Sequence, residues 1–76
     1  MPHVIVKMLV GRSEAQKAAI AEAVTRAVME TARCAENSVS VAIEDIAPEE
    51  WDAKVLDPDI RGRKASLYKK PGYAEV

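Results

Sequence analysis

The chain has 76 residues, of which eleven are basic and twelve acidic, giving a formal net charge of −1. This balance argues against a duplex-binding domain, which usually has a basic excess, and no apolar run approaches the roughly 20 residues that cross a bilayer. The single cysteine, Cys34, excludes an internal disulfide, and no Cys/His spacing suggests a zinc site. We therefore expect one domain over residues 1–76 of a cytoplasmic protein, with no nucleic-acid or membrane partner.

The first predicted element is a β-strand over residues 2–10, PHVIVKMLV, because valine and isoleucine fit a pleated surface. Its two faces are both partly apolar, with Val4, Val6, Met8 and Val10 on one and Ile5 and Leu9 on the other. A monomer of this size has too little chain to cover both faces, so the strand already favours association. His3, on the Ile5 face, is interpreted as a solvated side chain.

A long helix is predicted next, over residues 14–36. Ser13 is its expected N-cap, and Gln16 three residues later completes a capping box. The helical stripe consists of Ile20, Val24, Ala27, Val28 and Thr31. We expect Ala19 and Ala23 to fill the same stripe and to let a sheet approach closely.

The second strand is predicted over residues 38–46, SVSVAIEDI, which makes a βαβ unit with parallel strands and an α/β fold. Pro48 suits the start of a helical turn, and Asp57 is an expected cap for a short second helix through residues 61–70. Two strands and one helix leave a sheet face and edges open. We therefore expect a homo-oligomer, a dimer or alternatively a hexamer, to complete the fold.

Pro2 allows two interpretations. It could simply start the strand, where its missing N–H is tolerated. If Met1 is removed, however, Pro2 becomes a terminal secondary amine, more basic than an ordinary α-amino group with its pKa of about 8. Burial in an apolar pocket or a nearby cation lowers the pKa of such an amine, which would leave it neutral and able to act as a base.

The order of these features resembles the 4-oxalocrotonate tautomerase superfamily over nearly the whole chain. The shared features are Met-Pro before a strand, GRS before a helix, SVSV, an aromatic at Trp51 and the tail LYKKPGY. The tail and the length are similar to the subgroup related to phenylpyruvate keto–enol tautomerase, whose members form dimers. The resemblance implies an isomerase that needs no metal or organic cofactor and acts on small 2-oxo or enol acids, such as phenylenolpyruvate.

The resemblance also implies the site residues. Pro2 matches the catalytic general acid and base, Arg12 the arginine that binds a substrate carboxylate, and Trp51 an aromatic pocket wall. Ser40 departs from the pattern, because the family's archetype has arginine there, in a V-R-V context. A serine donates a hydrogen bond but has no charge, so a monocarboxylate substrate is favoured over a dicarboxylate, with Ser40 as a polar contact.

Pro2 and Arg12 stand at opposite ends of one predicted strand, about 33 Å apart at the usual rise per residue. We therefore expect a site shared between subunits. Two alternatives remain open: a hydratase, dehalogenase or decarboxylase on the same scaffold, or an oligomeric binding module without catalysis. The mass of the native N-terminus distinguishes the last, because a retained methionine would favour the binding module.

Overall fold

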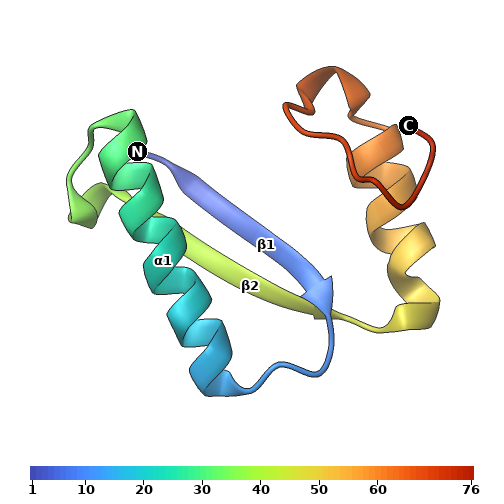
Figure 1. Ribbon diagram of the computed structural model, residues 1–76, viewed down its shortest axis with the longest axis horizontal. Coiled ribbons are helices and arrows are strands. Elements are labelled where there is room, and N and C mark those ends of the chain that lie inside the picture. Colours follow the sequence, from blue (N-terminus) through green and yellow to red (C-terminus); the bar gives the residue numbers. More distant parts are fainter. The chain divides into compact units, whose positions relative to one another are not determined.

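The computed structural model describes all of residues 1–76, which form two compact units, residues 1–45 and 46–76 (Figure 1). No helix in either unit has the length and apolar character to cross a bilayer.

The first unit confirms the predicted βαβ arrangement. Strand β1 (His3–Leu9) is followed by helix α1 (Glu14–Ala32), a single 3-10 turn η1 (Glu36–Ser38) and strand β2 (Ser40–Ile46), whose last residue begins the second unit. The two strands are parallel neighbours in a two-stranded sheet. Their pairing begins where the amide of Ser40 donates to the carbonyl oxygen of Pro2 at 3.1 Å.

The predicted capping box starts α1. The Ser13 hydroxyl accepts the amide of Gln16 at 3.1 Å, and the Gln16 side chain accepts the amide of Ser13 at 2.9 Å. Two amides that the first helical turn leaves without partners are thereby satisfied. The helix ends at Arg33, whose left-handed backbone (φ 55°) stops it before the expected end at residue 36.

Replacing the cap tests how much of the fold's stability depends on it. We expect Ser13→Ala to destabilise the protein by about 1 kcal/mol, which lowers the melting temperature by roughly 4–8 °C for a chain of this length. Thermal melting followed by circular dichroism, at one fixed protein concentration, measures the shift. Ser66→Ala is the control, because it changes an exposed serine that caps no helix, and an equal shift in both variants would contradict the expectation.

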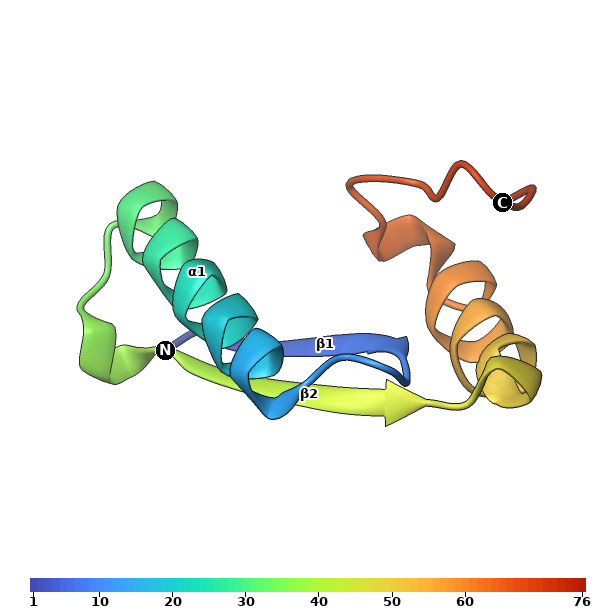
Figure 2. The same ribbon diagram turned by 60° about the horizontal axis from the view of Figure 1, so that its bottom comes forward.

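The half-buried side of α1 is rotated from the stripe that the sequence predicted, and Ala27 and Thr31 of that stripe are exposed. Ile20, Val24 and Val28 are half-buried, but Ala19 and Ala23 are exposed, so the expectation that these alanines face the sheet is wrong. Each alanine precedes a branched residue by one position and is turned about 100° from it. The branched side chains bury more apolar area against the sheet and so determine the helix rotation. Figure 2 shows α1 lying along one side of the two strands.

An ion pair joins α1 to β2. Lys17 Nζ lies 2.9 Å from Asp45 Oδ2 and 2.6 Å from Glu14 Oε2. Hydrogen bonds to Glu14 and then to Asp45 raise the pKa of Lys17 above its ordinary value. Because Asp45 reaches a helix residue, the alternation along β2 places Ser40, Ala42 and Glu44 on the other face of the sheet.

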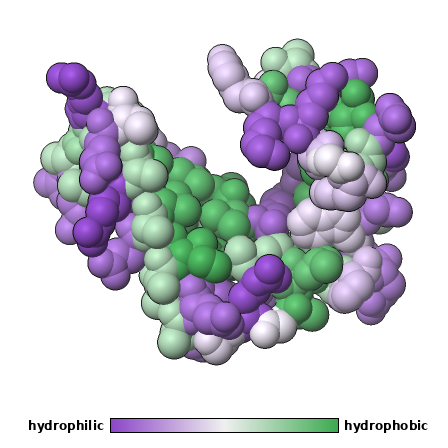
Figure 3. Space-filling model, viewed as in Figure 1, coloured by the Kyte–Doolittle hydropathy of each residue, from purple (hydrophilic) through white to green (hydrophobic).

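That other face, the open face, is not covered by a helix of the first unit (Figure 2). Ile5 and Leu9 of β1 are 51% and 40% exposed, and α1 contains no buried residue. On the opposite side, which carries α1, Figure 3 shows further hydrophobic side chains beside the helix. The first unit therefore has a helix packed on one face of its sheet but no closed hydrophobic core of its own.

The second unit has its helix earlier in the chain than expected. Pro48 begins the 3-10 turn η2 (Pro48–Glu50), as predicted, and a π-helix, η3 (Asp52–Arg61), follows it. The expected helix over residues 61–70 is therefore wrong, and only the short turn η4 (Lys64–Ser66) forms there. Burial explains the difference, because Val55 and Leu56 are 5% and 6% exposed and draw this segment into a helix.

Asp57 and Pro58 lie inside the π-helix, and Gly62 directly follows it. Pro58 has no amide to donate and occurs within the wider π-helical turns. Asp57 is not a cap: its carboxylate pairs with Arg61 at 3.3 Å, and its carbonyl accepts the amide of Gly62 at 2.8 Å. A Cβ at position 62 would lie only 2.7 Å from the Pro58 carbonyl oxygen, so glycine permits this helix end.

Candidate active site

Pro2 stands immediately before β1 and is fixed there by its backbone. Its carbonyl accepts the Ser40 amide, and Pro2 itself is half-buried. Met1, ahead of it, is fully exposed. Once Met1 is removed, the sheet would still hold the Pro2 nitrogen in place, because the Pro2 carbonyl is already hydrogen-bonded to β2.

Ser40 is the predicted site residue that the structure brings next to Pro2. Its hydroxyl also meets His3, with Nδ1 and Oγ 2.6 Å apart, and both side chains are exposed. Parallel pairing in this register puts the two side chains on the same open face. The sequence analysis missed the pair, because the residues are 37 positions apart and only the strand register joins them.

Arg12 lies beyond the opposite end of β1. Gly11 turns the chain there with a φ of +125°, and the Arg12 guanidinium donates to the Leu9 carbonyl oxygen at 3.1 Å. The seven strand residues between Pro2 and this turn span about 23 Å. Within one chain, then, Arg12 and Pro2 are not neighbours.

Trp51 belongs to the second unit, where it joins η2 to η3. Its indole Nε1 donates to the Tyr73 hydroxyl oxygen at 2.9 Å, and the Trp51 side chain is half-buried. Arg61 Nε donates to the Glu75 carbonyl oxygen at 3.2 Å and holds the same tail. The tail LYKKPGY was used in the sequence analysis only as a feature of the family resemblance, and no role was predicted for Tyr73.

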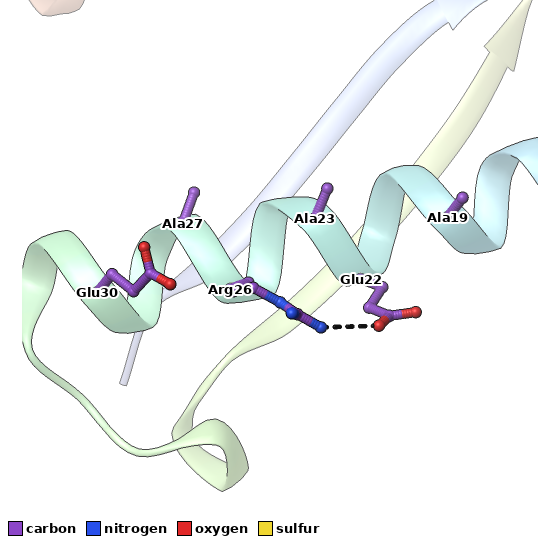
Figure 4. Close-up of a pocket in the computed structure, with 6 residues that line it drawn as sticks. All are labelled: Ala19, Glu22, Ala23, Arg26, Ala27 and Glu30. Carbon is purple, nitrogen blue, oxygen red and sulfur yellow. Dashed lines mark hydrogen bonds and ion pairs between the residues drawn. The ribbon is translucent and has the colours of Figure 1, made fainter.

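Two surface concavities lie elsewhere, on α1. One is lined by residues of the helix alone, and Figure 4 shows the three alanines among them beside the Arg26–Glu22 ion pair. The other is lined by α1 together with Glu36 and Val39. None of the four predicted site residues lines either one. A hollow on the flank of one helix encloses no reacting group, so we place the candidate site at Pro2 and not there.

Known proteins similar to this chain identify its family. Residues 2–56 match the sequence model of the Tautomerase family, described as tautomerase enzyme. A probable tautomerase of Xylella fastidiosa (strain 9a5c) is 37% identical over 76 residues, which cover 100% of this chain and 93% of the relative. Tautomerase PptA of Cronobacter sakazakii (strain ATCC BAA-894) is 38% identical over 74 residues, covering 96% of this chain and 97% of the relative.

Two solved structures are similar in fold and sequence. TomN, a 4-oxalocrotonate tautomerase homologue of the tomaymycin biosynthetic pathway, is 37% identical with a TM-score of 0.64, and the match covers 86% of this chain and 97% of TomN. YwhB, another homologue of 4-oxalocrotonate tautomerase, is 46% identical with a TM-score of 0.59, covering 60% of this chain and 75% of YwhB. The chain therefore belongs to the tautomerase family of enzymes and is an isomerase.

Proposed function

We propose that this tautomerase converts small 2-oxo monocarboxylates and their enols, such as phenylenolpyruvate, and that Pro2 is its general acid and base. The observation that carries the proposal is the position of Pro2, directly before β1 and with its carbonyl oxygen bonded to the Ser40 amide. Ser40, next to Pro2, has no charge to bind a second carboxylate, which favours a substrate with one carboxylate over a substrate with two.

The proposed chemistry needs only one proton carrier. With Met1 removed, the neutral secondary amine of Pro2 takes the proton from the enol hydroxyl at C2 and returns it to C3, so the ketone forms and the amine is regenerated. Lowering the pKa of the amine keeps it neutral near pH 7, and apolar surroundings together with a neighbouring cation would lower it. No metal or organic cofactor takes part in this sequence of steps.

We propose that a second copy supplies Arg12 to each Pro2. The length of β1 separates the two residues within one chain, and a guanidinium suits a carboxylate because its planar fork donates two parallel hydrogen bonds. Trp51 is the proposed aromatic wall for the substrate side chain, and Ser40 the proposed polar contact.

A homodimer is the assembly we propose, with a hexamer as the alternative. The exposed Ile5 and Leu9 and the absence of buried residues in α1 support an assembly that covers apolar surface the single chain leaves open. In a two-fold arrangement the two contacts are equivalent, so each chain can give its Arg12 to the partner's site and receive the partner's Arg12 at its own site. A shared site requires this reciprocity. Light scattering decides between dimer and hexamer.

Ketonisation of phenylenolpyruvate, followed by ultraviolet absorbance, tests the proposed substrate class. We expect kcat/KM for this monocarboxylate to exceed that for the dicarboxylate enol of 4-oxalocrotonate by about tenfold or more, the difference that one missing charge-assisted contact makes. A Ser40→Arg variant is the matched comparison. Its added charge should bring the kcat/KM values for the monocarboxylate and the dicarboxylate closer together. A wild-type preference for the dicarboxylate would overturn the assignment.

A further inference from the structure

His3, the partner of Ser40 on the open face, has no role in the mechanism so far. His3 directly follows Pro2, and its Nδ1 lies 2.6 Å from Ser40 Oγ. The Ser40 amide meanwhile donates to the Pro2 carbonyl oxygen. The pair is therefore joined to Pro2 through both strands, by a peptide bond on β1 and by a ladder hydrogen bond on β2.

The contact with Ser40 occupies one ring nitrogen and leaves Nε2 for another partner. A hydroxyl can either donate to or accept from Nδ1. If it donates, the ring takes the tautomer in which Nε2 carries the proton, so that Nε2 becomes a hydrogen-bond donor. His3 is exposed, so Nε2 is open to a partner from outside the chain.

We propose that His3, held in this tautomer by the Ser40 hydroxyl, donates from Nε2 to the C2 oxygen of the enol acid. The inference rests on the proposed function and adds a substrate contact to it. Arg12 would hold the carboxylate, and His3 would hold the C2 oxygen that gives up its proton to Pro2. The donor would come from β1, with its tautomer held by Ser40 of β2.

A donor suits this oxygen as the reaction proceeds. When Pro2 removes the enol proton, negative charge develops on the C2 oxygen, and a hydrogen bond to that oxygen becomes stronger. The ketone oxygen that results can only accept. An interaction that strengthens with developing charge raises kcat more than it tightens substrate binding, so His3 should affect kcat more than KM.

Two amide variants separate contact with the substrate from contact with Ser40. In His3→Asn the amide can take the place of Nδ1 and keep the Ser40 bond, whereas in His3→Gln it can reach the position of Nε2. We expect His3→Asn to lower kcat for phenylenolpyruvate about tenfold with KM within about twofold, and His3→Gln to stay within about threefold of wild type. Equal losses in both variants, or no loss in His3→Asn, would overturn the proposal.

The tautomer provides a second readout that does not depend on rates. The chain has a single histidine, so its imidazole nitrogen signals can be identified without ambiguity by NMR. We expect the neutral ring to carry its proton on Nε2 and to lose this preference in Ser40→Ala. A proton on Nδ1 in the wild type overturns the proposal. A wild type inactive on the enol overturns the proposed function instead, and the His3 contact with it.

Discussion

A chain whose Pro2 nitrogen is acylated is expected to lose tautomerase activity by a factor of about 10² to 10⁴, the usual contribution of a general acid and base. Any residue left ahead of Pro2 turns its amine into an amide, which has no basic lone pair at neutral pH. The measurement is the rate of phenylenolpyruvate ketonisation by a protein with a short N-terminal extension. Its protease-trimmed form, which begins at Pro2, should recover full activity.

The matched control moves the same extension to the C-terminus, where it leaves the amine free. Intact mass and light scattering establish that each form has the intended first residue and the same assembly. The Pro2→Ala variant, trimmed so that the substituted residue comes first, retains a primary amine and should fall between the extended and native forms. Equal activity of the extended and trimmed proteins would remove Pro2 from the mechanism.

Local rules predicted the first unit well, because its elements are specified by neighbouring residues. Ser13 and Gln16 are three positions apart and form the expected capping box, and the valine-rich segments form the two strands. The same rules wrongly predicted that Ala19 and Ala23 face the sheet. Helical periodicity gives the extent of an apolar stripe, but it does not say which part of the stripe a two-stranded sheet covers. The exposure of the two alanines reflects packing, which no local pattern encodes.

The second unit shows a different limit. Asp57 and Pro58 have the composition of a helix start, yet they lie inside a helix that began at Asp52. Burial of Val55 and Leu56 outweighed the local signal. Long-range pairing sets a similar limit in the first unit, where the side chains of His3 and Ser40 become neighbours only through strand register. No pattern of nearby residues predicts such a pair.

The predicted separation of Pro2 from Arg12 has the most direct functional test, because a shared site allows subunits to complement one another. Arg12→Ala alone should lower kcat/KM about 10- to 100-fold through loss of a charge-assisted carboxylate contact. Pro2→Ala is impaired for a different reason, the loss of the secondary amine. Mixed oligomers of the two variants, formed by co-expression, contain some sites in which the native Pro2 of one chain meets the native Arg12 of another.

Random mixing of two-fold related chains restores about one site in four, so the mixture should gain about 25% of wild-type activity. The fraction follows from independent choice of the chain that gives Pro2 and of the chain that gives Arg12, and it is the same in a dimer and a hexamer. Separately purified variants combined without exchange are the control and should stay at the low activity of the variants alone. If each chain used its own Arg12, no mixture would contain an intact site, and co-expression would not raise the activity above that control.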